Sequence, residues 1–378
     1  MKDRMNASLH DLMREATRLT QGGQLAEATA ALQQALRGAM PAASPTTTAD
    51  PGLVIDGHVF EVPEPGRPRP APAAPEAAQP SPAAQPDSFV AGVLAHGGRS
   101  WRYKLYVPPA AAQATAAAPL PLVVMLHGCT QNPDDFAAGT GMNTLAREQG
   151  FYVLYPEQSQ GANPQRCWNW FKHNHQQRGS GEPAAIAALV QTVRAAHPVD
   201  AGRVYVAGLS AGGAMAAIVA AAYPDVFAAA GVHSGLPGDA AGNLQEALAA
   251  MNGSATGPSA AARTPRPAKP VPTIVFHGDA DATVHPRNGE RLLSAAVAGG
   301  AGGTAAPEVE QGRSAGGRRF SRRLHRAADG RTQAEHWLVH GAGHAWAGGQ
   351  PRGSYTDAAG PDASREMLRF FLQHRLPA

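Results

Sequence analysis

The sequence contains little cysteine, little charge and few aromatic residues. Its 378 residues include two cysteines, 16% charged residues and 6% aromatic residues, and the net charge is only +3. The two cysteines, Cys129 and Cys167, do not have the spacing of a zinc site. A nucleic-acid-binding protein concentrates basic residues among aromatic ones, whereas the basic run at 316–326 is typical of a solvated loop and strand edge. We therefore predict no nucleic-acid partner and no metal site.

Long apolar runs are also absent. The first residues lack the apolar stretch of roughly 7–15 residues that a secretory signal requires. No segment approaches the roughly 18 apolar residues of a membrane-spanning helix. These absences favour a soluble, cytoplasmic protein, and in that compartment the two cysteines are expected to be free, buried thiols. Hydrophobic residues still make up 43% of the chain, which is enough for a sizeable core.

Composition divides the chain into three parts. Residues 8–38 show two helical patterns of apolar residues separated by Gly22 and Gly23, so residues 1–38 are expected to form a helical hairpin. Residues 39–87 are rich in proline and alanine, a composition that buries no core and is typical of an extended linker. Residues 88–378 are then expected to form the main folded domain.

Within residues 88–378, apolar strand candidates alternate with helical patterns. The strand candidates are 101–107, 120–127, 151–156, 203–210, 227–235, 272–278 and 335–341, and the helical stretches are 134–149, 182–197, 211–223, 287–298 and 363–374. Continuous apolar strands separated by helices indicate an α/β domain whose mainly parallel sheet is covered by helices on both faces. Residues 252–270 and 299–317 are expected to be surface insertions. Ligands of such sheets bind beyond the carboxyl ends of the strands.

One serine stands between glycines at the end of a predicted strand. The stretch 204–214 reads VYVAGLSAGGA, which is a strand, then Gly208-Leu209-Ser210-Ala211-Gly212, then a helical pattern. This is the G-x-S-x-G turn in the strand–turn–helix setting that exposes a nucleophilic serine. The turn also leaves the Ala211 N–H at a helix N-terminus, where it favours negative charge. Ser210 is therefore the candidate nucleophile.

A serine hydroxyl needs a base that is itself held by an acid. In this setting the chain order is serine, then acid, then histidine. Asp279 and Asp281 follow the strand 272–278, and His344 lies in a glycine-rich loop after the last predicted strand. We predict Asp281 as the acid and His344 as the base, with Asp279 as the alternative acid and turn former. His340 lies within the strand pattern and is less free to move.

Stabilisation of a developing oxyanion requires a second backbone donor besides Ala211. His127-Gly128-Cys129 follows the strand 120–127, where this arrangement supplies that amide. The N–H groups of Cys129 and Ala211 are therefore the predicted oxyanion hole. The side chain of His127 is expected to hold the loop rather than to titrate.

Six motifs together resemble those of a known family. They are LHGCTQNPDDFA, GMNTLAREQGFYVLYPEQ, CWNWF, GLSAGGAMA, HGDADATVHP and GAGHAWAGG, in this order between about residues 88 and 375. The pattern is similar to the esterase family of poly(3-hydroxybutyrate) depolymerases, whose relatives include feruloyl and acetylxylan esterases. The resemblance implies an α/β-hydrolase fold and a triad of Ser210, Asp281 and His344, with the Cys129 amide in the oxyanion hole.

The resemblance has further implications for side chains near this site. It implies a Cys129–Cys167 disulfide that pins the oxyanion loop, although such a bond conflicts with a cytoplasmic location, and the family is largely extracellular. Trp168 and Trp346 lie beside loops that flank the site and are expected to contact the substrate. Trp170 and Phe171 fit core packing and substrate contact equally well.

The expected activity is hydrolysis of poly(3-hydroxybutyrate) or its oligomers by a serine esterase, through an acyl-enzyme and without a cofactor. A feruloyl or acetylxylan esterase is the alternative, and a non-catalytic granule-binding protein is the more remote one. The chain ends soon after its last helical pattern, so no separate C-terminal substrate-binding module is expected. The N-terminal hairpin is then a candidate for binding a polymer granule surface.

Overall fold

The structure is a computed structural model that describes residues 87–255, 257–265, 270–298 and 307–377. The predicted hairpin at 1–38 and nearly all of the predicted linker at 39–87 lie outside these residues. The strands are β1 (Ser88–His96), β2 (Arg99–Val107), β3 (Leu120–Leu126), β4 (Tyr152–Pro156), β5 (Val199–Leu209), β6 (Ala229–His233), β7 (Thr273–Gly278), β8 (Glu308–Arg313), β9 (Arg319–Arg326), β10 (Thr332–Val339), β11 (Trp346–Ala347) and β12 (Thr356–Asp357). The α-helices are α3 (Pro133–Thr140), α4 (Met142–Gln149), α5 (Gly181–Ala196), α6 (Ala211–Ala222), α7 (Leu244–Met251), α8 (Arg287–Val297) and α9 (Ala363–Phe371).

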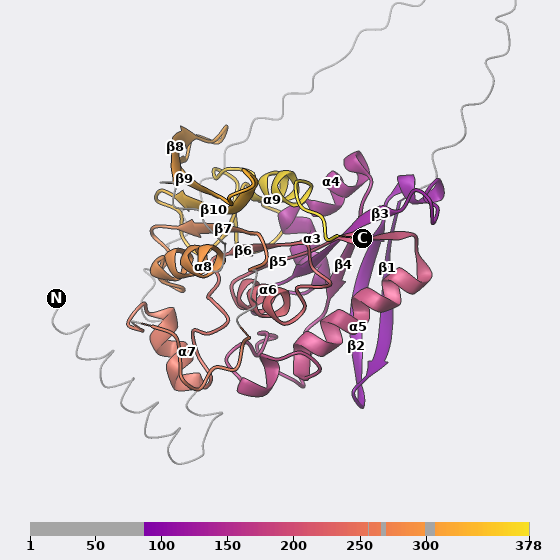
Figure 1. Cartoon of the computed structure of the whole chain (residues 1–378), viewed down its shortest axis with the longest axis horizontal. Coiled ribbons are helices and arrows are strands. Elements are labelled where there is room, and N and C mark those ends of the chain that lie inside the picture. Colours follow the sequence, from indigo (N-terminus) through magenta and orange to yellow (C-terminus); the bar gives the residue numbers. More distant parts are fainter. Residues whose placement is uncertain (1–86, 256, 266–269, 299–306, 378) are drawn as a thin grey trace, which may run out of the picture. The chain divides into compact units, whose positions relative to one another are not determined.

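The first ten strands form one sheet in the order β1-β2-β4-β3-β5-β6-β7-β10-β9-β8 (Figure 1). The central strands from β4 to β10 in this order are parallel. Antiparallel pairs extend the sheet at both edges, β2 with β1 at one and β9 with β8 at the other. The predicted α/β class is therefore confirmed, with a parallel centre and antiparallel edges.

Helices cover both faces of the sheet, and the alternation of residues along β3 shows how. Leu122 and Val124 pack with α5 and α6, whereas Val123 and Met125 pack with α3, α4 and α9. Helix α8 lies on the face covered by α6 and packs on β7 and β10. Because both faces of the central strands are buried, their sequences read as continuous apolar runs.

A glycine divides the predicted helix 134–149 into two. Asn132 caps α3 by accepting a hydrogen bond from the Asp135 N–H, and Gly141 ends it with a φ of 65°. Residues with a side chain rarely adopt this left-handed conformation, so glycine is the usual helix terminator. The chain changes direction there before α4 begins.

Five strands and one helix are not among the elements expected from the sequence. They are β1, β8, β9, β11, β12 and α7, and β8 and β9 fall in the predicted insertion 299–317 and the basic run 316–326. Strand β8 is the edge strand and is largely exposed, and β9 beside it is only partly buried, so both carry charged residues in place of a continuous apolar run. Their arginine and glutamate side chains pair across the strands instead.

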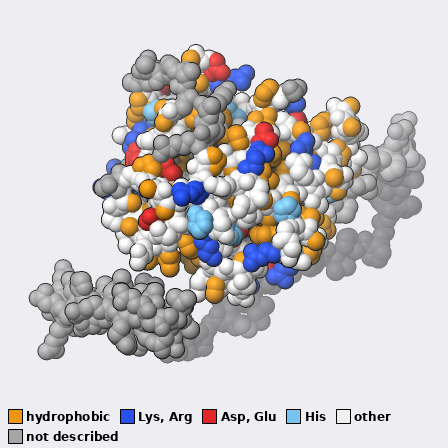
Figure 2. Space-filling view, turned by 60° about the horizontal axis from the view of Figure 1, so that its bottom comes forward, with side chains coloured by type: hydrophobic (Ala, Val, Ile, Leu, Met, Phe, Trp, Pro, Cys, Tyr) orange, Lys and Arg blue, Asp and Glu red, His pale blue; other side chains and the backbone are white. Residues whose placement is uncertain are grey.

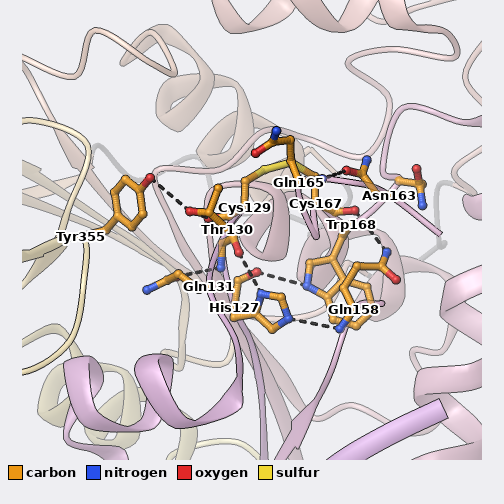
Figure 3. Close-up of a disulfide and its surroundings, with 12 residues drawn as sticks. His127, Cys129, Thr130, Gln131, Gln158, Asn163, Gln165, Cys167, Trp168 and Tyr355 are labelled. Atoms are coloured by element: carbon orange, nitrogen blue, oxygen red, sulfur yellow. Dashed lines mark hydrogen bonds between the residues drawn. A yellow bond between two sulfur atoms is a disulfide. The ribbon is translucent and has the colours of Figure 1, made fainter. Parts of the chain in front are cut away.

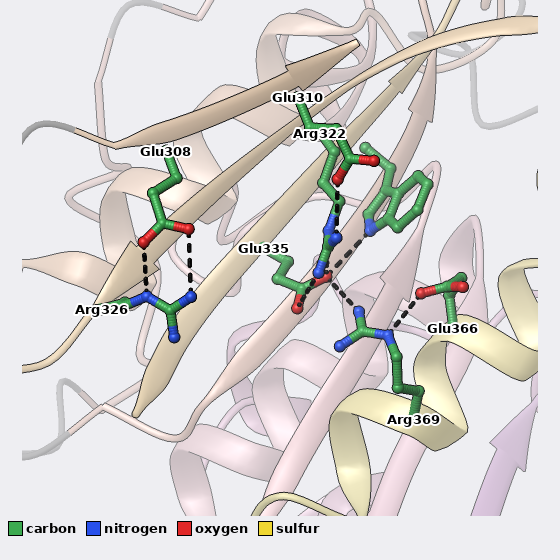
Figure 4. Close-up of polar contacts among 8 residues, drawn as sticks. Glu308, Glu310, Arg322, Arg326, Glu335, Glu366 and Arg369 are labelled. Atoms are coloured by element: carbon green, nitrogen blue, oxygen red, sulfur yellow. Dashed lines mark hydrogen bonds and ion pairs between the residues drawn. The ribbon is translucent and has the colours of Figure 1, made fainter. Parts of the chain in front are cut away.

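A buried carboxylate connects β10 to its neighbours. Glu335 of β10 is fully buried and accepts hydrogen bonds from Arg322 of β9 at 3.1 Å and from Arg369 of α9 at 2.7 Å (Figure 4). The indole N–H of Trp337 donates to the same carboxylate at 3.2 Å. This cluster fixes the strand whose carboxyl end leads into the loop that carries His344.

Charged side chains are spread over the surface. Figure 2 shows basic side chains scattered over the face it presents, several of them beside acidic ones. Arg318 with Asp357 and Arg323 with Glu290 are two such pairs.

Candidate active site

Ser210 lies in the turn between β5 and α6 with a strained backbone. Its φ is 58° and its ψ is −120°, a conformation that costs a residue with a side chain on the order of 1–3 kcal/mol. A Cβ atom at Gly212 would lie 2.1 Å from the Leu126 carbonyl oxygen, and one at Gly208 would lie 2.4 Å from Gly212. Only glycine fits at these two positions, so the glycines let α6 pack directly against β3 and β5.

The structure pairs Asp281 with His344. Asp281 follows β7, and its Oδ1 accepts hydrogen bonds from the Thr283 and Val284 N–H groups at 2.9 and 2.8 Å. Its Oδ2 lies 2.8 Å from His344 Nδ1. The carboxylate is the acceptor, so His344 carries its proton on Nδ1 and keeps Nε2 free as a base.

The pKa of Asp281 reflects these contacts. Burial alone would raise it, but hydrogen bonds from His277 and His344 outweigh burial and hold the pKa of Asp281 below its usual value. The side chain therefore stays ionised through the neutral pH range. A charged carboxylate is the form that stabilises a histidine cation beside it.

His233 of β6 connects the Ser210 turn to the His344 loop. The His233 carbonyl accepts the Ser210 N–H at 2.9 Å, and its Nε2 accepts the Ala347 N–H, also at 2.9 Å. Burial lowers the pKa of His233 to about 3, which keeps this ring neutral and its Nε2 available as an acceptor. In the described residues, Ser210 Oγ makes no hydrogen bond to His344. Catalytic contacts of this kind are often long without substrate.

The alternative acid and the alternative base pair with each other. Asp279 Oδ2 lies 2.8 Å from His340 Nδ1, and Asp279 Oδ1 accepts the Gly341 N–H at 2.6 Å. Asp279 lies in the turn that the Asp281 N–H closes on the Gly278 carbonyl oxygen at 3.3 Å, and its side chain joins this turn to the loop after β10. His340 Nε2 lies 2.9 Å from Ser321 Oγ. Ser321 is within β9, whose backbone pairs with β8 and β10, so it has no turn like that of Ser210.

The predicted oxyanion donors lie on two different elements. In the loop after β3, the Gly128 N–H donates to Gln131 Oε1 at 2.9 Å and the Thr130 N–H donates to Gln165 O at 2.6 Å. The Cys129 N–H between them has no acceptor among the described residues. Ala211 is the first residue of α6, where a helical N–H has no partner within its own helix. Both amides are thus free to bind an anion.

His127 holds the start of this loop. It is fully buried, its Nδ1–H donates to Gly128 O at 2.8 Å, and its Nε2 accepts the Gln158 N–H at 3.1 Å. Burial lowers the pKa of His127 to about 4. A neutral ring with both nitrogens occupied agrees with the structural role expected from the sequence.

A disulfide joins Cys129 to Cys167, with sulfur atoms 2.04 Å apart (Figure 3). The bridge that the family resemblance implied is therefore confirmed, and the expectation of two free thiols is wrong. Next to the bridge, Gln158 Nε2 donates to the Cys167 carbonyl at 3.1 Å and Trp168 Nε1 donates to His127 O at 3.1 Å. These contacts fix the loop on both sides of Cys129.

The sequence predicts that Trp168 and Trp346 contact the substrate, but both side chains are buried. Both indoles are 0–1% exposed. The indole N–H of Trp346 donates to Ser364 Oγ at 3.0 Å, so neither its ring nor its donor is available to a ligand. Both side chains turn inward from their loops because the core offers them apolar contacts and acceptors. Trp170 and Phe171 also pack in the core, edge to face.

Sequence reasoning missed an exposed aromatic residue beside the oxyanion loop. Tyr355 is 46% exposed, has a φ of 52°, and its hydroxyl lies 3.3 Å from Thr130 Oγ1 (Figure 3). Thr130 directly follows Cys129. A lone tyrosine in a polar segment gives no signal in the sequence, because only the fold brings it next to Thr130.

A cavity of about 500 Å³ lies elsewhere, between α6 and α8. Its lining includes Ala217 of α6, Leu292 of α8 and Thr273 at the start of β7. Strand β7 runs parallel to β5 through β6, so this cavity is at the amino ends of the strands. Ser210 follows the carboxyl end of β5, at the opposite edge of the sheet.

The part of the chain that the structure describes shows neither a metal cluster nor a membrane helix. No group of three or more histidine, cysteine, aspartate or glutamate residues there has the arrangement to hold a metal ion. None of the helices in these ranges has the length and apolar character needed to cross a membrane.

Comparisons with known proteins identify relatives of this chain. Poly(3-hydroxyalkanoate) depolymerase C of Paucimonas lemoignei is 36% identical over 231 residues, which cover 59% of this chain and 54% of that protein. Feruloyl esterase B of Neurospora crassa is 35% identical over 136 residues, which cover 36% of this chain and 44% of that protein. The chain thus spans about half the length of the curated relatives it matches.

Solved structures and the family comparison agree on the fold. The acetyl xylan esterase from Aspergillus awamori superposes with a TM-score of 0.54 at 20% identity, covering 72% of this chain and 94% of that one. The fold is accordingly that of an α/β-hydrolase, as the motifs implied. Residues 101–311, more than half of the chain, match the family described as Esterase PHB depolymerase. The chain therefore belongs to the esterase family of poly(3-hydroxybutyrate) depolymerases.

Proposed function

We propose that this protein is a serine esterase in which Ser210 is the nucleophile, His344 the general base and Asp281 the residue that orients the base. The observation that carries the proposal is the 2.8 Å contact between Asp281 Oδ2 and His344 Nδ1. It fixes the tautomer in which His344 Nε2 accepts a proton. The strained turn supports the same roles, because it places Ser210 beyond the carboxyl end of β5, at the N-terminus of α6.

Hydrolysis proceeds in two steps. Ser210 Oγ attacks the ester carbonyl carbon while His344 Nε2 takes the hydroxyl proton, and His344 then gives this proton to the departing alkoxide. The product of the first step is an acyl-enzyme. A water molecule attacks its carbonyl, His344 again takes the proton, and the carboxylic acid leaves as Ser210 recovers its own proton.

The N–H groups of Cys129 and Ala211 bind the oxyanion in both steps. Each donor of this kind is typically worth about 3–4 kcal/mol of barrier. The disulfide at Cys129 and the Gln131 contact to Gly128 support this role, because they restrain the loop at and beside the Cys129 amide.

The proposed substrate is poly(3-hydroxybutyrate) or its oligomers. The similarity to a poly(3-hydroxyalkanoate) depolymerase extends over 59% of the chain, against 36% for the feruloyl esterase. Tyr355, exposed beside the oxyanion loop, offers an aromatic surface to the acyl chain. Binding of a polymer granule by residues 1–38 stays a prediction. A feruloyl or acetylxylan esterase is the second candidate, supported by the 35% identity to feruloyl esterase B.

Parallel assays of three substrates test the proposal. Hydrolysis rates would be measured on short nitrophenyl esters, 3-hydroxybutyrate oligomers and feruloyl sugars. Each substrate would be assayed with the wild type, with Ser210→Ala and with Ser321→Ala. Ser321 also lies next to a histidine–aspartate pair, so it is a matched control. We expect Ser210→Ala to lose activity at least about 10³-fold, Ser321→Ala to retain it, and the oligomers to be the preferred natural ester.

Three outcomes would contradict this function. Activity that persists in Ser210→Ala excludes Ser210 as the nucleophile. Preference for feruloyl sugars over hydroxybutyrate oligomers selects the second candidate. Failure of a fluorophosphonate to label Ser210 in the wild type supports a non-catalytic granule-binding protein.

A further inference from the structure

A second histidine contacts the carboxylate of Asp281. His277, within β7, is fully buried, and its Nε2 lies 3.5 Å from Asp281 Oδ2 and 2.8 Å from the Val284 carbonyl oxygen. His344 approaches the same Oδ2 at 2.8 Å. The other oxygen, Oδ1, is occupied by two backbone N–H groups. His277 is thus the remaining side chain that can restrain Oδ2.

The partners of His277 determine where its proton is. A carbonyl oxygen and a carboxylate can only accept hydrogen bonds. The proton must therefore be on Nε2, and Nδ1 of the neutral ring carries a lone pair. That Nδ1 is buried and has no hydrogen-bond partner among the described residues.

The Nδ1 side of the His277 ring faces Gly289 of α8. A Cβ atom at Gly289 would lie 3.1 Å from His277 Nδ1 and 2.8 Å from His336 Nε2, so this glycine makes room for both rings. Gly289 is in the first turn of α8, and the N-terminal end of a helix repels a cation. His336 of β10 is also fully buried, and within the described ranges neither of its ring nitrogens makes a hydrogen bond, although Nδ1 lies 3.8 Å from Glu290 Oε1.

Several other titratable or charged groups lie around His277. His233 of β6 interacts with it electrostatically. Glu290 of α8 and Arg323 of β9 act on His336, behind the Gly289 position. Asp281 is therefore the anion that His277 Nε2 contacts, at 3.5 Å.

We propose that His277 is a positioning residue for the hydrolytic reaction: as a neutral imidazole it donates from Nε2 to the Val284 carbonyl and to Asp281 Oδ2, and so fixes the carboxylate against His344. This inference rests on the proposed function. During the reaction the cation that forms beside Asp281 is His344, and the Nε2 donor of His277 holds the carboxylate in place for it.

Substitutions of His277 that keep or remove its donor test the role. In His277→Gln the amide nitrogen occupies the place of Nε2, whereas His277→Leu has no donor. We expect kcat for a nitrophenyl ester to fall about 10- to 100-fold in His277→Leu, with KM unchanged, and to be largely restored in His277→Gln. The acidic limb of the kcat/KM profile should move to higher pH in His277→Leu, because Oδ2 then interacts with His344 alone.

Gly289→Ala provides a second variant that changes no titratable group. The added Cβ displaces the His277 ring and should lower kcat in the same direction. His374→Leu is the matched control, because His374 is a buried histidine that packs on Phe370 and not on Asp281. It should keep the wild-type kcat and pH profile, and thermal unfolding would show that each variant is folded.

The outcomes separate the two proposals. If the wild type neither hydrolyses esters nor reacts with a fluorophosphonate at Ser210, the proposed function fails. Suppose that the wild type is active and that His277→Leu and Gly289→Ala are folded. If both variants then have the wild-type kcat, the wild-type rate of fluorophosphonate labelling and the wild-type acidic limb of the kcat/KM profile, His277 has no positioning role. A loss of kcat that His277→Gln does not restore also overturns the proposal.

Discussion

Two aspartates, two residues apart, acquire different surroundings at the end of β7. Asp281 is buried, receives two backbone N–H groups and contacts His277 and His344. Asp279 is largely exposed and contacts His340 and the Gly341 N–H. The pKa of both carboxyls is lowered, because these hydrogen bonds outweigh burial. The two aspartates therefore differ in their histidine partner, which is His344 for Asp281 and His340 for Asp279.

Exchange of each carboxylate for an amide should separate their roles. Asp281→Asn changes an acceptor into a donor on one side and favours the wrong His344 tautomer, so kcat should fall about 10³- to 10⁴-fold. Asp279→Asn should leave kcat close to that of the wild type. Initial rates on a nitrophenyl ester measure both. Equal losses in the two variants would mean that either pair supports the reaction.

Single residues of the site differ in how far the sequence predicts them. Ser210, Asp281 and His344 stand in motifs that follow the chain order of this fold class, so the sequence alone proposes them as the triad. Tyr355 and His233 give no such signal, because their contacts join segments that are far apart along the chain. His277 stands only four residues before Asp281, but it lies within an apolar strand pattern that does not report the direction of its ring. The expectation for Trp168 and Trp346 rests on their place beside loops, and the direction of a side chain is set by packing that the sequence does not report.

At the level of elements, the apolar pattern predicted the parallel centre of the sheet and missed its edges. Buried strands such as β3 carry continuous apolar residues, and helices α5, α6, α8 and α9 begin and end within a few residues of the predicted bounds. Strands β8 and β9 are held together by charge pairs across the two strands, Glu310 with Arg322 and Glu308 with Arg326. Charge pairs between neighbouring strands produce no periodic pattern of apolar residues along the chain, so the sequence predicts loops for these segments.

The Glu335 cluster allows a test of how β10 is held. Glu335 is buried with Arg322 and Arg369, whereas the Glu308–Arg326 pair across β8 and β9 is exposed (Figure 4). Glu335→Gln leaves two guanidinium groups without their common anion and should lower the free energy of unfolding by about 3 kcal/mol. Glu308→Gln should change it little, since exposed pairs contribute little. Urea unfolding measures both, and similar losses would contradict the buried role.

For the whole molecule, buried histidines make stability depend on pH. Burial lowers the pKa of His127, His336 and His374 to about 4 and that of His233 to about 3. In the unfolded chain these rings titrate near 6.5, so below this pH the unfolded state binds more protons than the folded one. The contribution of these histidines to the free energy of unfolding is largest above pH 7. It falls by about 1–2 kcal/mol per histidine between pH 7 and pH 5.

Denaturant midpoints at pH 7 and pH 5 measure this effect. The wild type should lose stability over this interval, and His374→Leu, which lacks one of the four groups, should lose less. His374 lies outside the proposed active site, so the comparison does not involve the reaction. Identical losses in the two proteins would show that burial of His374 does not control its protonation.

The direct backbone contact between Gly212 and the end of β3 also bears on how such enzymes diverge. It makes the attacking hydroxyl and the anion-binding strand one unit that tolerates no side chain between its parts. Exposed positions such as Tyr355 lie outside this unit. If the proposed function holds, exchanges at such positions would change the preferred ester one step at a time, with every intermediate protein still active.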